Sequence, residues 1–216
     1  METKSRPADD QERKSLQTAT FGLGCFWGPD ASFGAMPGVV RTRVGYAGGS
    51  SPDPTYQDIG DHTEVVQVDF HPEACSFADL LTHFWEGHNP ERAPYKRQYR
   101  SVILTHDEDQ QAQALASSER EAERRGSPVS TKVESLDRFY VAEDYHQKYQ
   151  LRRDKTLMSE FKARYPDAKA FREAPETALV NGFVAGHGST QQLENYLSSA
   201  SLSDSAKRHL RATHSR

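Results

Sequence analysis

Cys25 carries the most versatile chemistry in this chain, because a thiolate is both a nucleophile and a redox centre. It lies in the segment GCFWG at residues 24–28, where a short β-prone stretch gives way to a helical one. A helix start offers free backbone N–H groups and a positive dipole end, and both favour the thiolate. Phe26 and Trp27 would place two apolar rings beside the sulfur. This arrangement suits a substrate in which a small apolar group adjoins a polarised atom.

The alternative for Cys25 is an inert buried thiol, as free cysteines usually are. Cys75 is the only other cysteine, and it directly precedes Ser76, which is placed to cap a helix. Leu80 follows where a hydrophobic contact would close that cap. We interpret Cys75 as a packed structural thiol, with the resolution of an oxidised Cys25 as the alternative. A disulfide would require Cα atoms within about 7 Å of each other.

Further short segments accompany GCFWG in a fixed order along the chain. They are GYAGG at residues 45–49, PTY at 54–56, GDHTEV at 60–65, QYRS at 98–101 and AEDYHQ at 142–147. In combination, this set resembles the A-type peptide methionine sulfoxide reductases over residues 19–153. No single segment is specific for this family, whereas the combination of all six in this order and spacing is.

The resemblance implies roles for four side chains. Cys25 would attack the sulfoxide sulfur, and Glu64 would protonate the departing oxygen, which requires burial that keeps it partly protonated near neutral pH. Tyr56 and Tyr99 would hydrogen-bond that oxygen and stabilise its developing charge. Without the resemblance, Glu64 is typical of a solvated charge and the tyrosines of loop or core aromatics. His62 is a possible base, but we interpret it as a support of its loop.

The resemblance also implies a substrate and a product state. Phe26 and Trp27 would form the walls of a pocket for the substrate methyl group. The substrate would be the S epimer of methionine sulfoxide, free or in oxidised proteins, and Cys25 would be left as a sulfenic acid.

The chain departs from the family pattern at two places. Many relatives carry an aspartate five residues before the tyrosine equivalent to Tyr99, where this chain has Pro94. Four nearby residues could take over the role of this aspartate, and the sequence does not favour one of them: Glu91, Arg92, Tyr95 and Arg97. No cysteine follows Cys75, which resembles the single-cysteine branch of the family. The sulfenic acid would then be reduced by an external thiol: thioredoxin, glutaredoxin with glutathione, or dithiothreitol.

The elements that must position these residues form an alternating pattern. Strands are expected at residues 19–24, 39–46, 64–70, 101–105 and 129–134, and helices at 26–35, 77–85, 107–125, 142–153, 154–164, 189–198 and 203–213. This order predicts an α+β fold, a ferredoxin-like split βαβ plait with helices on one face of the sheet and a C-terminal helical appendage. We expect a disordered polar tail at 1–18, a catalytic domain at 19–170 and a helical extension at 171–216, with a linker near 173–177.

Composition narrows the partners. The chain has 216 residues and a formal net charge of −4, which argues against nucleic acid as a partner. Its apolar runs are too short for a membrane helix, and its first residues lack the apolar core of a secretory signal. We therefore expect a cytoplasmic monomer. Scattered histidines, with His83 and His88 five residues apart, predict no metal site, and we expect no bound cofactor.

Two other functions remain compatible with a reactive Cys25. The first is a peroxidase that uses the same thiol on hydroperoxides, which would leave Phe26, Trp27, Tyr56 and Glu64 without a clear purpose. The second is a non-enzymatic protein that binds oxidised methionine on a partner, which the missing aspartate and the absent tail cysteine would favour.

Overall fold

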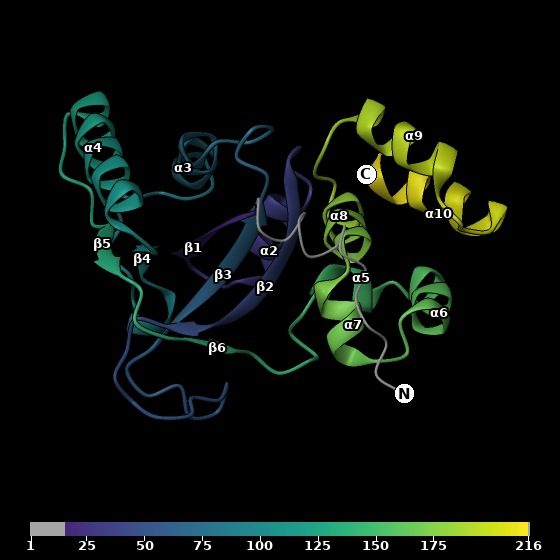
Figure 1. Ribbon diagram of the computed structural model, residues 1–216, viewed down its shortest axis with the longest axis horizontal. Helices are drawn as coiled ribbons and strands as arrows, with labels where there is room; N and C mark the ends of the chain where they lie inside the picture. The colour runs from purple at the N-terminus through teal and green to yellow at the C-terminus, as the bar shows by residue number, and fades with distance from the viewer. Residues whose placement is uncertain (1–15, 216) are drawn as a thin grey trace.

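The computed structural model describes residues 16–215 and shows a mixed α+β fold around a six-stranded sheet (Figure 1). The strands are β1 (Gln17–Leu23), β2 (Val39–Ala47), β3 (Thr63–Phe70), β4 (Ser101–Thr105), β5 (Lys132–Ser135) and β6 (Phe139–Val141). Their order across the sheet is β5-β4-β1-β3-β2-β6. Neighbouring strands are antiparallel except β4 and β5, which are parallel.

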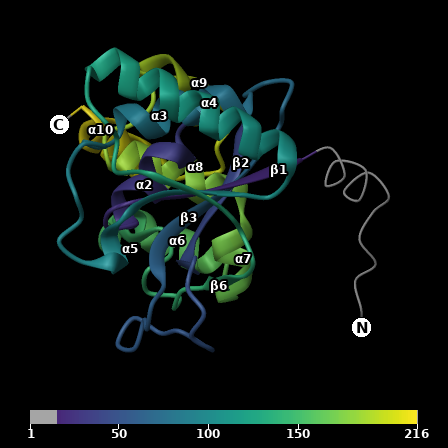
Figure 2. The same cartoon turned by 90° about the vertical axis from the view of Figure 1, so that its left-hand side faces the viewer.

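Nine α-helices and one 3₁₀ turn are formed by the described residues. They are α2 (Trp27–Gly34), α3 (Phe77–Glu86), α4 (Glu108–Arg125), α5 (Tyr149–Arg153), α6 (Lys155–Arg164), α7 (Ala168–Glu173), α8 (Pro175–Val184), α9 (Thr190–Ser199) and α10 (Asp204–His214), with a 3₁₀ turn, η1 (Arg97–Tyr99). In both overall views α3 and α4 lie together and away from α6 and α7 (Figures 1 and 2). No helix in the described part of the chain is long and apolar enough to cross a membrane.

The strand register brings three segments to one end of the sheet. Leu23 at the end of β1 pairs with Ser101 at the start of β4. Glu64 near the start of β3 pairs with Tyr46 near the end of β2. Cys25, Glu64 and the η1 turn before Ser101 therefore meet at this end.

One face of the sheet carries the larger core. Phe21 of β1, Val66 of β3 and Ile103 of β4 pack there against apolar residues of α2 and α3. The helix α3 begins at a capping box, in which the Ser76 and Asp79 side chains each accept a hydrogen bond from the other residue's backbone N–H. The cap and the amphipathic pattern expected for α3 are both confirmed.

The N-terminal and C-terminal boundaries differ from expectation. Residues 1–15 of the expected tail lie outside the described residues, but Gln17 and Thr18 pair with β3 and belong to the sheet. The linker expected near 173–177 is wrong, because α7 ends at Glu173 and α8 begins at Pro175. Proline is well tolerated at the first position of a helix, where its missing N–H costs no hydrogen bond.

The helix α8 packs closely on α2, so the expected boundary at residue 171 falls inside a continuous structure. A Cβ atom on Gly34 of α2 would lie 2.5 Å from the Ala178 carbonyl oxygen, and one on Gly182 would lie 2.6 Å from the Ala31 oxygen. Such an approach requires glycine at both positions. The helices α5 to α10 share a second core. Its buried residues include Phe161, Phe183, Leu197 and Leu210. The two expected C-terminal helices are confirmed as α9 and α10.

The helix expected over 142–153 is present only from Tyr149 onward. Residues before it follow the edge of β2 instead, where the Gln147 side chain takes the place of a strand partner. Its Oε1 accepts from the Val44 N–H at 3.0 Å, and its Nε2 donates to the Val44 carbonyl at 2.8 Å. Tertiary contacts thus override local helix propensity here. β6 was not expected, and the strand expected at 129–134 is shifted to β5.

Candidate active site

Cys25 lies between β1 and α2, at a sharp turn of the chain. Gly24 has a φ of +106°, a conformation that favours glycine, and Phe26 is the N-cap residue of α2. The turn leaves Cys25 exposed to solvent. The expected strand-to-helix position of this thiol is confirmed.

Glu64 is buried beside Cys25, with 1% of its surface exposed. The Phe26 backbone N–H donates to its Oε2 at 3.1 Å, and the Gln98 Nε2 donates to its Oε1 at 2.7 Å. Burial raises the pKa of Glu64 above its usual value, although the hydrogen bonds from Gln98, Phe26 and Cys25 act in the opposite direction. A carboxyl group in this setting holds a proton to higher pH than an exposed glutamate.

The thiol of Cys25 is more basic than the sequence predicts. Desolvation raises its pKa, and the neighbouring Glu64 raises it further, while the Trp27 backbone N–H lowers it. The Trp27 N–H at the helix start does favour the thiolate, but it changes the pKa less than the partial desolvation of this surface-exposed thiol by its neighbours. The expectation that the helix start lowers the pKa of this thiol is therefore wrong, because the combined effects raise it. Burial thus raises the pKa of both the Cys25 thiol and the Glu64 carboxyl group.

Tyr99 and Tyr56 complete the polar side of the site. Desolvation, followed by the nearby Glu64 and Tyr56, raises the pKa of the Tyr99 phenol, so Tyr99 remains a hydrogen-bond donor. Tyr56 is 39% exposed, and its backbone N–H donates to Glu143 at 2.9 Å. Tyr46, which sequence reasoning did not single out, donates its hydroxyl to the same Glu143 carboxylate at 2.7 Å. Glu143 thereby fixes the loop that carries Tyr56.

An aromatic wall adjoins Cys25 on the α2 side. Trp27 stacks on Tyr149 with ring centroids 3.6 Å apart and an interplanar angle of 1°. Its indole N–H donates to the Nδ1 atom of His146 at 3.1 Å. The buried Phe26 ring lies 5.1 Å from the His146 ring, and the Tyr56 ring lies 4.6 Å from it. These contacts gather the rings around His146 and fix the orientation of Trp27.

His146, to which the sequence alone assigns no role, organises this wall. Burial lowers its pKa, so the ring is neutral. Because Nδ1 accepts from Trp27, the ring proton lies on Nε2. That Nε2 atom is buried without a hydrogen-bond partner among the described residues. His62, in contrast, supports its loop as expected: it accepts from the Gly49 N–H and donates to the Ser51 carbonyl.

Cys75 lies at the opposite end of the sheet from Cys25. Glu64, beside Cys25, and Phe70, shortly before Cys75, are separated by six residues of β3, which is about 20 Å at about 3.3 Å per residue. Cys75 is buried in the larger core. A disulfide between the two cysteines of one folded chain is therefore excluded by distance.

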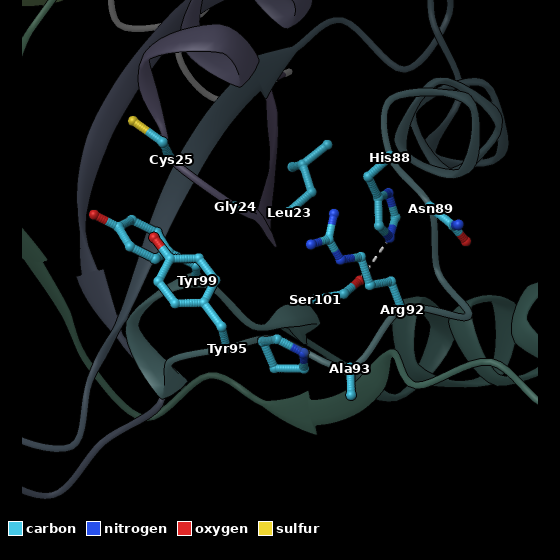
Figure 3. Close-up of a pocket in the computed structure, with 11 residues that line it drawn as sticks. Leu23, Gly24, Cys25, His88, Asn89, Arg92, Ala93, Tyr95, Tyr99 and Ser101 are labelled. Carbon is cyan, nitrogen blue, oxygen red and sulfur yellow. Dashed lines mark hydrogen bonds between the residues drawn. The ribbon is translucent and has the colours of Figure 1, made fainter.

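A pocket of about 410 Å³ opens beside Cys25 (Figure 3). Tyr95 and Tyr99 line it together with Arg92 and His88, whereas Phe26, Trp27 and Tyr56 do not. Cys25 therefore adjoins both the aromatic wall and a pocket that none of those rings lines.

A family model described as peptide methionine sulfoxide reductase matches residues 17–177. The chain belongs to this family. The reductase is 46% identical to a peptide methionine sulfoxide reductase of Drosophila melanogaster over 179 residues, which are 82% of this chain and 72% of the relative. It is 44% identical over 149 residues to one from Methanoculleus marisnigri, covering 63% of this chain and 90% of that one.

Solved structures agree with this assignment. The reductase resembles methionine sulfoxide reductase A of Corynebacterium diphtheriae with a TM-score of 0.60 and 32% identity, over 66% of this chain and 76% of that one. It resembles reduced Mxr1 of Saccharomyces cerevisiae with a TM-score of 0.59 and 27% identity, over 70% and 90% of the two chains. The protein is thus an oxidoreductase that acts on sulfur.

Proposed function

We propose that the reductase acts on the S epimer of methionine sulfoxide, in oxidised proteins and as the free amino acid. Cys25 is the nucleophile in this proposal, Glu64 the acid, and Tyr56 and Tyr99 bind the oxygen. The observation that carries the proposal is the buried carboxyl group of Glu64 next to an accessible thiol, with its pKa raised by burial. A chiral sulfoxide can satisfy both the oxygen site and the methyl wall of Phe26 and Trp27 in only one configuration.

The reaction moves one oxygen atom and one proton. The productive form of the pair is a Cys25 thiolate with a protonated Glu64, which has the same number of protons as a thiol with a carboxylate. The thiolate attacks the sulfoxide sulfur to form a sulfur–sulfur bond, and Glu64 gives its proton to the oxygen. The hydroxyl group then moves to Cys25: its bond to the substrate sulfur and the sulfur–sulfur bond break as the bond from oxygen to the Cys25 sulfur forms. Methionine leaves with its sulfur reduced, and Cys25 is oxidised to the sulfenic acid. The Tyr99 phenol stabilises the oxygen while it carries negative charge.

We propose that the sulfenic acid is recycled by a thiol from outside the chain. Two external thiols are needed for each turnover: one displaces water to form a mixed disulfide with Cys25, and one releases the enzyme thiol. Thioredoxin, glutaredoxin with glutathione, or dithiothreitol would serve. The distance between Cys25 and Cys75 supports this proposal. We further propose a monomer acting in the cytoplasm, where two free thiols remain reduced.

We also infer that the central strands form a ferredoxin-like split βαβ plait. Two features support this: the order β4-β1-β3-β2 with antiparallel neighbours, and the connection of β1 to β2 through α2.

The test uses separated S and R epimers of a methionine sulfoxide peptide with dithiothreitol as the reductant. We expect turnover of the S epimer only, complete loss of turnover in Cys25→Ser, and full activity in the matched variant Cys75→Ser. Retained activity in Cys25→Ser, or equal rates for both epimers, would refute the proposal.

A further inference from the structure

The pocket beside Cys25 has one charged side chain directed into it. We call it the Arg92 groove and define it by Leu23, Cys25, His88, Arg92, Tyr95 and Tyr99. In Figure 3 the Arg92 guanidinium points into the middle of this groove, between Leu23 and Ser101.

His88 and Ser101 form the uncharged floor of the groove. Their polar atoms are hydrogen-bonded to other protein groups. The His88 Nδ1 atom donates to the Phe84 carbonyl at 2.8 Å, and its Nε2 accepts from the Ser101 hydroxyl at 2.7 Å. Ser101 is in turn bonded to the Thr131 hydroxyl at 2.6 Å. Burial lowers the pKa of His88 and keeps the ring uncharged. The floor therefore offers no charge that competes with Arg92.

The charge of Arg92 is not neutralised by its neighbours. The neighbouring Glu91 is directed away from Arg92. Its carboxylate accepts a hydrogen bond from the Ser127 hydroxyl and lies 3.8 Å from the Arg125 guanidinium. Within residues 16–215, Arg92 forms no ion pair with a carboxylate; the nearest acidic residue in sequence, Glu91, pairs with Arg125. Glu64 is the acidic group of the adjoining site, but it does not line the groove.

The loop that carries Arg92 is held in place from the other side. The Ser130 N–H and hydroxyl donate to the Pro90 carbonyl at 2.7 and 2.8 Å. The same hydroxyl donates to the Arg92 carbonyl at 3.1 Å. A fixed backbone lowers the entropic cost of binding a ligand with the Arg92 side chain.

We propose that the Arg92 groove binds the small anionic thiol that recycles Cys25, with Arg92 bound to a carboxylate of that thiol. Glutathione, a tripeptide thiol with two carboxylates, has this chemistry. Neither Phe26 nor Trp27 of the methyl wall lines the groove, so the groove gives the second substrate contacts of its own beside Cys25. Arginine suits this task, since its guanidinium donates two parallel hydrogen bonds to a carboxylate.

The groove acts after methionine has left, so this inference rests on the proposed sulfenic acid. The bound thiol attacks the Cys25 sulfur as a thiolate, and the sulfur–oxygen bond breaks as the sulfur–sulfur bond forms. The hydroxyl group leaves as water with the proton of the thiol. Cys25 is reduced and the incoming sulfur is oxidised in the mixed disulfide. A second molecule of the same thiol then releases Cys25 and gives the thiol's own disulfide.

The test measures how fast a preformed Cys25 sulfenic acid reacts with glutathione and with glutathione whose carboxylates are esterified. We expect Arg92→Gln to lower the rate constant for glutathione about tenfold, because a charged hydrogen bond to its carboxylate is lost. The rate constant for the glutathione ester should be unchanged. Arg92→Lys should retain part of the rate. The exposed Arg208→Gln on α10 is the matched control for the same change in net charge and should react like the wild type.

Three outcomes would overturn the inference. The first is an unchanged glutathione rate in Arg92→Gln, and the second is an equal loss with both thiols. The third is a loss confined to methionine release from a sulfoxide peptide with acidic neighbours, which would assign the groove to the first substrate. Methionine release without any sulfenic acid would instead refute the proposed function, so the two failures are distinguishable.

Discussion

At the residue scale, Cys25 and Glu64 behave as one acid–base unit. Each group sets the proton affinity of the other, because the Glu64 charge raises the pKa of the thiol and the thiol donates a hydrogen bond to the carboxylate. Activity needs one proton on the pair, placed on Glu64. We therefore expect kcat/KM to fall at low pH, where both groups are protonated, and at high pH, where Glu64 has lost its proton.

Glu64→Gln separates the two roles of this carboxyl group. The neutral amide removes the charge that raises the Cys25 pKa, so we expect the midpoint of thiol alkylation by iodoacetamide to move to lower pH. Reductase activity should nevertheless fall about 100-fold or more, because the proton donor is lost. The control is Glu119→Gln on the exposed surface of α4. An unchanged alkylation profile in Glu64→Gln would contradict the coupling.

His146→Ala tests the aromatic wall. Without the acceptor for its indole N–H, Trp27 loses one of the two contacts that fix its ring, so KM for the sulfoxide should rise about fivefold, as for one hydrogen bond. His146→Asn retains an acceptor oxygen and should recover part of that loss. Alkylation of Cys25 should be unaffected in both variants. Slower alkylation of Cys25 without a rise in KM would contradict this role and show that His146 acts on the thiol.

The residues around Cys25 could be predicted in part. The short sequence segments predicted that Cys25, Glu64 and Tyr99 lie in one site. They could not give the pKa direction of the thiol, because burial depends on the folded surroundings. Gln98 and His146 lie in those same segments, but their contacts span 34 and 119 residues of sequence and become apparent only in the fold.

At the element scale, the site depends on how α2 is held. The helix α8 approaches α2 so closely that Gly34 has no room for a side chain, since a Cβ atom would lie 2.5 Å from a carbonyl oxygen. The buried Asp30 of α2 also pairs with the buried Lys148 at 3.1 Å and accepts a hydrogen bond from Asn181 of α8. These contacts orient the helix that begins just after Cys25.

Gly34→Ala should therefore separate α8 from α2 and lower the free energy of unfolding by about 1–3 kcal/mol, as overpacking does. Gly28→Ala, in the same helix, is the matched control, because a Cβ atom there meets nothing within 4 Å. Urea unfolding curves of the two variants measure the difference. Equal stability of both variants would contradict the role assigned to the α2–α8 contact.

Elements with local signals were predicted well, whereas those set by distant contacts were not. The caps at Ser76 and Asp107 and the αL glycine at Gly126 mark helix ends in the sequence itself. The segment at 142–148 has a helical composition, but Gln147 bonds to the edge of β2. Pro175 indicated a linker, yet it begins α8.

At the scale of the whole molecule, the second core connects the C-terminal helices to the site through α8. Leu210 of α10 is fully buried in that core. We expect Leu210→Ala to lower the free energy of unfolding by about 2–5 kcal/mol. Leu115→Ala, at a position that is 48% exposed on α4, is the control and should change little. Loss of activity and loss of helical circular dichroism should coincide on heating. Activity that persists after the C-terminal helices melt would show that they are independent of the site.

The central claim is that Cys25 takes the oxygen atom of the sulfoxide. Its most direct test is one turnover, without external thiol, on a methionine sulfoxide peptide whose sulfoxide carries a heavy isotope of oxygen, followed by mass spectrometry of the Cys25 peptide. The account predicts one heavy oxygen atom on Cys25 for each methionine released, an unmodified Cys75 and no disulfide within the chain. Methionine release with Cys25 unmodified, or a Cys25–Cys75 disulfide, would contradict it.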